Sequence, residues 1–85
     1  MPEVADDPVL ELVERIAHAL VDKPKDVDVR AVDGHQSRIF ELRVDPDDLG
    51  KIIGKKGRTA KSIRTLLGAA GTKLNKRFTL EIIEE

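Results

Sequence analysis

The chain has 85 residues, of which 40% are hydrophobic and 36% are charged. A chain of this length forms one domain that buries roughly 60–65% of the surface of its unfolded form, which leaves no room for a deep substrate cavity. The absence of cysteine excludes disulfides, thiolate nucleophiles and cysteine zinc sites, and two histidines alone predict no metal site. No apolar run approaches the ~18–20 residues of a membrane span, and the start is acidic, unlike a secretory signal. We therefore expect a cytoplasmic protein without membrane contact.

The first predicted element is a helix that follows a tail of residues 1–6. Asp7 can accept a hydrogen bond from an amide of the first turn, and Pro8 suits the first helical position because it has no amide to leave unpaired. The helix is expected to end before Pro24, and the domain is expected to span residues 7–85. The apolar residues at helical spacing are Val9, Leu10, Leu12, Val13, Ile16, Ala17, Leu20 and Val21.

Two runs of alternating apolar and polar residues, 27–31 and 40–44, predict half-buried strands. Between them lies the dipeptide Asp33-Gly34, which tolerates positive φ and is typical of a tight reversal. We therefore predict an antiparallel hairpin with a tight reversal at Asp33-Gly34 and with His35 and Gln36 near its tip.

The second half of the chain predicts two helices and a last strand. Asp45 and Pro46 repeat the cap-and-proline pattern and begin a short helix that reaches Ile53. A longer helix is expected from Arg58 to about Asn75, continuous through two glycines that each weaken it by roughly 1 kcal/mol. Its expected buried stripe consists of Ile63, Leu66, Leu67, Ala70 and Leu74. With a final strand at residues 78–82, the order is α-β-β-α-α-β in one α+β domain, with a three-stranded sheet packed against three helices.

Charge is strongly segregated along the chain, although the formal net charge is only -1. Residues 1–50 carry six basic and thirteen acidic side chains, and residues 78–85 carry three acidic ones. Residues 51–77 carry no acidic side chain and nine basic ones: Lys51, Lys55, Lys56, Arg58, Lys61, Arg64, Lys73, Lys76 and Arg77. A run of this kind favours a surface that faces a polyanion, the alternative being an ordinary solvated helix face.

The most informative stretch is Gly54-Lys55-Lys56-Gly57, which lies between the two predicted helices. Glycine has no Cβ, so these positions let the chain reverse and let another backbone approach closely. The helix that follows has unpaired amides and a positive dipole end, to which the lysines and Arg58 add full charges. Together these features predict a binding site for phosphate groups.

These residues resemble the signature of the KH domain, in which an apolar pair and Gly-x-x-Gly precede a helix. The hairpin before the two helices and the strand after them resemble the type II KH arrangement, from about Asp7 to Ile83. The Gly-Lys-Lys-Gly-Arg motif, the closing Arg-Phe-Thr-Leu-Glu-Ile and the short chain further resemble the KhpA (YlqC) family of small bacterial RNA-binding proteins.

The resemblance implies that the loop residues Gly54, Lys55, Lys56 and Gly57 clamp the backbone of about four nucleotides of single-stranded RNA. Arg58 and Lys61 would add charge to this contact. Ile52 and Ile53 would form the floor of a groove for the bases, although both positions equally suit the core. Ala60 is smaller than the aliphatic residue that many KH domains have there, which leaves the groove depth open.

The resemblance also implies partners and a cellular role. The family is similar to RNA chaperones and post-transcriptional regulators that pair with KhpB, a larger KH-containing protein, and that are linked to cell elongation and envelope synthesis. A homodimer would be an alternative to such a pair. Because the only aromatic residues, Phe40 and Phe78, occupy inward strand positions, we expect no exposed stacking platform.

Two other classes of function are an enzyme and a protein-interaction module. Ala60-Lys61-Ser62 superficially resembles a nucleotide-binding loop, but the glycines required before the lysine are replaced by Ala60 and Lys55. No serine has a recognisable base and orienting acid, so neither catalysis nor a cofactor is expected. The remaining rival is a protein-interaction or dimerisation module with secondary or no RNA binding.

Overall fold

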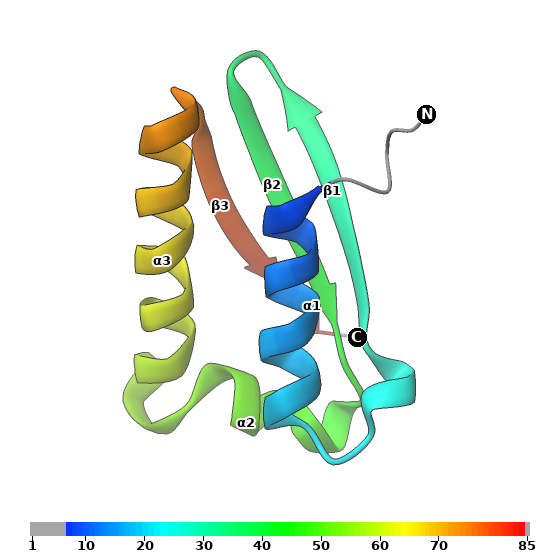
Figure 1. Cartoon of the computed structure of the whole chain (residues 1–85). Helices are drawn as coiled ribbons and strands as arrows, with labels where there is room; N and C mark the ends of the chain where they lie inside the picture. Colours follow the sequence, from blue (N-terminus) through cyan, green and yellow to red (C-terminus); the bar gives the residue numbers. More distant parts are fainter. Residues whose placement is uncertain (1–6, 85) are drawn as a thin grey trace.

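The computed structural model describes residues 7–84 and has the predicted order α-β-β-α-α-β (Figure 1). The predicted tail, residues 1–6, lies outside the described residues. The α-helices and strands are α1 (Pro8–Leu20), β1 (Asp28–Gly34), β2 (Ser37–Arg43), α2 (Leu49–Ile53), α3 (Arg58–Leu74) and β3 (Arg77–Ile82). Short 3-10 turns stand at Pro24–Asp26, Pro46–Asp48 and Lys55–Gly57.

The strands form one mixed sheet in the order β1-β2-β3. β1 and β2 pair antiparallel as the predicted hairpin, whereas β2 and β3 pair parallel. Parallel pairing needs a long crossover, which α2 and α3 provide. The long helices α1 and α3 run beside each other along the sheet (Figure 1), and β3 is left as an edge strand beside α3.

The core lies between the helices and one face of the sheet. Its fully buried side chains include Val13 of α1, Phe40 and Leu42 of β2, and Leu67 of α3. The rings of Phe40 and Phe78 meet edge to face with their centroids 5.5 Å apart. Both aromatic residues are therefore in the interior, as predicted.

The predicted start and end of α1 are confirmed. The amide of Leu10 donates to the Asp7 carboxylate at 3.0 Å, and Pro8 is the first helical residue. The helix ends at Leu20, before Pro24. Leu12, which the periodicity placed on the apolar face, is 42% exposed. No helix within residues 7–84 has the length and apolar character to cross a bilayer.

The hairpin turns at His35 and Gln36, the residues predicted near its tip, but the tight reversal predicted at Asp33-Gly34 is wrong. Asp33 and Gly34 belong to β1 and pair with Arg38 and Ser37, so that the turn is His35-Gln36 with a positive φ of 58° at Gln36. This register aligns apolar residues across the strands, Val29 with Leu42 and Ala31 with Phe40. It also sets Asp33 opposite Arg38, with which it forms an ion pair. Cross-strand complementarity has prevailed over the local turn preference.

Helix α3 is continuous through Gly68 and Gly71, as predicted, and ends at Leu74. The prediction of its buried stripe is partly wrong, because Leu66 is 56% exposed and Leu74 is 52% exposed. The residues that α3 does bury are Ala60, Ile63, Leu67 and Gly71. Gly71 is buried because β3 returns across it: a Cβ there would lie 2.4 Å from the Lys76 carbonyl oxygen.

Candidate nucleic-acid interface

The segment before the glycine loop is built in two steps. The Asp45 carboxylate accepts a hydrogen bond from the Asp47 amide at 2.8 Å and caps the 3-10 turn that begins at Pro46. α2 follows directly and ends at Ile53, and the amide of the capping residue Gly54 donates to the Gly50 carbonyl at 2.8 Å. The single short helix predicted for 46–53 is therefore a 3-10 turn joined to one and a half turns of α-helix.

The loop Gly54–Gly57 depends on both glycines, for different reasons. Gly54 has φ 78° and ψ 169°, and a Cβ there would lie 2.2 Å from the Thr59 hydroxyl oxygen and 2.8 Å from the Thr59 amide nitrogen. Gly57 has φ 75° and ψ 12°, but a Cβ there would meet nothing within 4 Å. The first glycine thus permits close packing on α3, and the second permits a left-handed conformation in open space.

The two central lysines of the loop, Lys55 and Lys56, lie within its 3-10 turn. Lys56 itself has a positive φ of 57°, and the Gly57 amide donates to the Gly54 carbonyl at 3.0 Å, which closes the 3-10 turn. Lys55 and Lys56 are both exposed. Neither forms an ion pair with any residue of the described chain, so both charges are available to a ligand.

Helix α3 begins immediately after the loop and adds further positive potential. No side chain caps its N-terminus at Gly57, and the helix runs for 17 residues, long enough for its dipole to favour an anion at that end. Arg58 and Lys61 are exposed in its first turns. The predicted residues Gly54 to Gly57, Arg58 and Lys61 are therefore brought to one end of the molecule.

Lys51, which belongs to the same basic run, differs from its neighbours. Its ammonium lies 3.2 Å from the Asp22 carboxylate and 3.3 Å from the Asp48 carboxylate. Hydrogen bonds to Asp22 and Asp48 raise the pKa of Lys51 above its ordinary value. This charge is neutralised within the protein, so the positive surface is smaller than the sequence count indicates.

Asp48 is a structural residue to which the sequence analysis gives no role. Its side chain is 1% exposed and accepts hydrogen bonds from the amides of Asp22 at 3.2 Å and Lys23 at 3.1 Å. Burial acts to raise the pKa of Asp48, but these amides and the Lys51 ammonium outweigh burial and hold the pKa below its ordinary value. Asp48 thereby joins the segment after α1 to the start of α2, the helix that carries the loop.

The two isoleucines before the loop have different environments. Ile52 is 0% exposed and belongs to the core, which leaves it no surface for a base to contact. Ile53 is half-buried beside Gly54, and Ala60 is buried in the first turns of α3. Of the two predicted groove residues, Ile53 is the one with accessible surface.

Comparison of the chain with known proteins identifies its family. The sequence model of the KhpA/KhpB KH domain matches residues 10–82. The chain belongs to the KhpA/KhpB family of KH domains. Its fold is the type II KH arrangement, and as a member of a family of RNA-binding proteins it is not an enzyme.

Individual relatives agree with the family. The chain is 59% identical over 73 residues to the RNA-binding protein KhpA of Clostridium perfringens. This match covers 86% of this chain and 97% of the relative. It is 51% identical over 75 residues to the RNA-binding protein KhpA of Borreliella burgdorferi, and this match covers 88% of this chain and 92% of the relative. The fold is similar to part of a crystal structure of a variant of Era from Aquifex aeolicus bound to GDP and AlF4−, with a TM-score of 0.57 and 25% identity. That match covers 88% of this chain and 29% of the Era chain.

Proposed function

We propose that this protein binds single-stranded RNA and that Gly54, Lys55, Lys56 and Gly57 hold the sugar-phosphate backbone. The observation that carries the proposal is the loop itself: two exposed lysines, which have no ion-pair partner within residues 7–84, lie between two glycines at positive φ. The names of the KhpA relatives, which are RNA-binding proteins, support the choice of ligand. The absence of an exposed aromatic platform among the described residues favours a clamp on the backbone over stacking of bases.

The proposed contact is mainly electrostatic. Phosphate oxygens would accept hydrogen bonds near the start of α3, with the lysines, Arg58 and Lys61 as the nearby charges, and bases would reach the half-buried surface around Ile53. A clamp that touches two to four phosphates gives a slope of log K against log salt concentration of about -1.5 to -3, from roughly -0.7 per phosphate of a single strand. One such domain binds modestly, and a second linked clamp would increase the apparent affinity.

The cellular role that we propose follows the family resemblance. The protein would act in the cytoplasm as an RNA chaperone and post-transcriptional regulator linked to cell elongation and envelope synthesis, together with a KhpB-like KH-containing partner. The exposed leucines of α3, Leu66 and Leu74, lie outside the basic loop, so RNA binding and pairing with another protein can use different residues.

Two exposed leucines of α3 support a second, compatible role in self-association. Leu66 and Leu74 are each more than half exposed, although helical periodicity placed them in the core. Large apolar side chains that are exposed on a helix surface with otherwise charged, hydroxyl and small side chains are typical of a contact between proteins. Light scattering measures this directly: a homodimer doubles the mass of the chain without RNA, and Leu66→Lys should return it to the monomer mass.

The RNA proposal is tested by reversing the loop charges. Lys55→Asp with Lys56→Asp places carboxylates where phosphates are proposed to bind, and position 56 tolerates Asp at positive φ better than most residues. We expect fluorescence anisotropy with single-stranded RNA to show at least about a tenfold loss of affinity and a shallower salt dependence.

The matched control is Arg15→Glu with Lys25→Asp, which changes the net charge equally at two exposed positions away from the loop. This control should keep most of the affinity, and both variants should retain their melting transitions. Unchanged RNA affinity in a folded loop variant, or an equal loss in the control, would remove the clamp and leave the protein-interaction module as the better explanation.

A further inference from the structure

One face of the sheet is not covered by the helices. α1 and α3 lie on the same face of the sheet (Figure 1), and the buried strand residues, such as Phe40 and Leu80, belong to the core that these helices complete. Because side chains alternate along a strand, the intervening residues of the three strands form the opposite face, here called the open face. The central residues of the open face are Arg30, Val32, Ile39, Glu41, Thr79 and Glu81.

The open face has an aliphatic pair at its centre. Val32 of β1 and Ile39 of β2 are Cα partners in the antiparallel register, so their side chains are neighbours. They are 47% and 39% exposed. Within residues 7–84 they are the exposed large aliphatic residues that lie outside the helices, so the exposed apolar surface of the sheet is concentrated in this one place. Such a concentration is typical of a contact with another molecule.

Beside this pair, two carboxylates lie next to each other on neighbouring strands. Glu41 of β2 and Glu81 of β3 are Cα partners in the parallel register, which places their side chains on the same face. Neither carboxylate forms a hydrogen bond or an ion pair with another residue in the range 7–84. Like charges directly opposite each other destabilise a sheet. Natural sequences break such rules mainly at functional sites, so the pair indicates a function of the open face.

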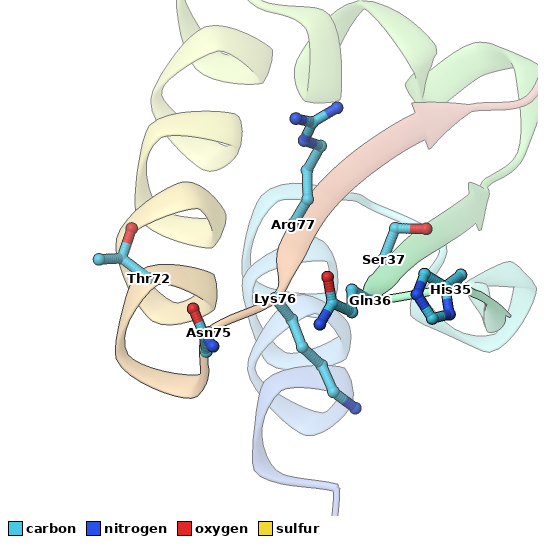
Figure 2. A pocket seen from close by; sticks show the side chains of 7 residues that line it. All are labelled: His35, Gln36, Ser37, Thr72, Asn75, Lys76 and Arg77. Atoms are coloured by element: carbon cyan, nitrogen blue, oxygen red, sulfur yellow. The ribbon is translucent and has the colours of Figure 1, made fainter.

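Two nearby cations do not neutralise these carboxylates. Arg30 lies opposite Glu41 in the register, but its guanidinium donates to the Asp28 carboxylate at 2.9 Å. Arg77 precedes Glu81 by four residues, which is about 13 Å along β3. There Arg77 lines a cavity of about 570 Å³ that is open to solvent and is shared with the hairpin turn and the end of α3 (Figure 2). The two carboxylates are therefore available to a cation of another molecule.

We propose that the open face binds an amphipathic helix of another protein that carries leucine or another aliphatic residue and, one turn away, arginine or lysine. A sheet face is usually covered by a helix or by another sheet. The aliphatic pair and the carboxylate pair are offset by one strand and two residues, which places them about 8 Å apart. On a helix, side chains four residues apart have Cβ atoms about 5–6 Å apart, and the long side chain of arginine covers the remaining distance.

The charge of the open face favours a protein over a nucleic acid as the ligand. Two carboxylates without a cation repel a polyanion, whereas they attract the guanidinium or ammonium group of a partner. The glycine loop lies between α2 and α3, and its residues are not part of the sheet. Binding at the open face therefore uses other residues than the proposed RNA contact, and this inference goes beyond the proposed function.

The test uses a defined probe, a capped alanine-based helical peptide of about 16 residues in which each of two leucines is followed one turn later by arginine. One control peptide has glutamate in place of arginine, and another has alanine in place of leucine. Each peptide is titrated into the full chain without RNA, and NMR follows the amides of Ile39, Glu41, Thr79 and Glu81. These amides should shift with the probe and not with the glutamate peptide, and the alanine peptide should bind at least about threefold more weakly.

Variants of the chain locate the contact. Glu41→Gln with Glu81→Gln removes both carboxylates and keeps the size of the side chains. The matched control, Glu11→Gln with Glu14→Gln, likewise removes one half-buried and one exposed carboxylate, here from α1. We expect the open-face variant to bind the probe about fivefold more weakly than the wild type, with a shallower salt dependence, and the control to bind it normally. Equal losses in the two variants, or shifts confined to the helices of the wild type, would overturn the proposal.

A measurement without the probe tests the premise that the carboxylates repel each other. Glu81→Gln should raise the thermal unfolding midpoint at low salt, and added salt should remove the gain. Glu11→Gln should not raise the midpoint, because an acid in the first turn of a helix is favourable. A Glu81→Gln variant no more stable than the wild type would overturn the proposal. A solution mass that is larger for the wild type than for Glu81→Gln would assign the open face to a second copy of the chain and would also overturn it.

Discussion

Replacement of either loop glycine by alanine should have unequal consequences, although both glycines have similar positive φ. In Gly57→Ala the new methyl group enters open space, so the cost is that of a left-handed alanine, about 1–2 kcal/mol. In Gly54→Ala the conformation is one that almost only glycine adopts, which costs about 1–3 kcal/mol. The new Cβ would also lie 2.6 Å from the Thr59 Cβ and 2.8 Å from its amide nitrogen. Helix α3 must then move, and overpacking of this kind adds about 1–3 kcal/mol.

We therefore expect Gly54→Ala to lower the free energy of unfolding by about 2–6 kcal/mol and Gly57→Ala by about 1–2 kcal/mol. A domain of this length has a stability of about 4–13 kcal/mol, so the first variant should unfold at a much lower urea concentration or fail to fold. Urea titration followed by circular dichroism measures both values.

Thr59→Ala provides the internal control for Gly54→Ala. It removes the hydroxyl, the nearest atom, but leaves the Cβ and the amide nitrogen that also obstruct the new methyl group. The double variant should therefore remain nearly as unstable as Gly54→Ala alone. Equal destabilisation by the two glycine replacements, or full recovery in the double variant, would refute the packing argument.

The glycines of α3 give a second matched pair: Gly71→Ala should destabilise by at least about 2 kcal/mol, because its Cβ would lie 2.4 Å from the Lys76 carbonyl oxygen. Gly68→Ala, in open space on the same helix, should stabilise by about 0.4–1 kcal/mol, and thermal unfolding that ranked the two alike would contradict this. Asp48→Asn should destabilise the fold at neutral pH far more than Asp47→Asn, since Asp48 is buried among its partners while Asp47 is largely exposed. The folded pKa of Asp48 is lowered, so its contribution is present above the unfolded pKa of about 3.9 and is lost as pH falls through the folded value. The stability gap between wild type and Asp48→Asn should accordingly narrow below about pH 4, and a gap that stayed constant in acid would show that Asp48 does not act through its charge.

Local signals in the sequence were sufficient for the elements themselves. Asp7 with Pro8 and Asp45 with Pro46 begin their helices as predicted, because a cap and a proline act within a few residues of each other. The glycine loop was likewise evident from residues that are adjacent in the chain. These features need no knowledge of what packs against them.

The errors arise where distant segments decide the outcome. The reversal lies at His35-Gln36, the residues predicted near the tip, and not at Asp33-Gly34, because the register that aligns the apolar pairs of β1 and β2 is set by the whole hairpin. Helical periodicity identified a face of α3 but could not show that the sheet leaves Leu66 and Leu74 uncovered.

Two features of the candidate site were beyond sequence reasoning for the same reason. Asp48 binds amides 25 and 26 residues away, and nothing in a run of neighbouring acids distinguishes the one that becomes buried. The pairing of Lys51 with Asp22 depends on the same contact between the end of α1 and α2. A charge count along the chain therefore overestimated the free positive surface by at least this lysine.

The close packing of Gly54 on Thr59 has a consequence for the association rate of a ligand that binds the loop. Hydrogen bonds from the Gly54 and Gly57 amides and the packing of Gly54 on Thr59 of α3 hold the loop in one conformation, and if the proposed clamp binds RNA in this conformation, the loop is ordered before the encounter. Little ordering entropy is then lost on association, and no slow rearrangement separates collision from a completed complex. In stopped-flow mixing, the observed rate should rise linearly with RNA concentration and show no plateau.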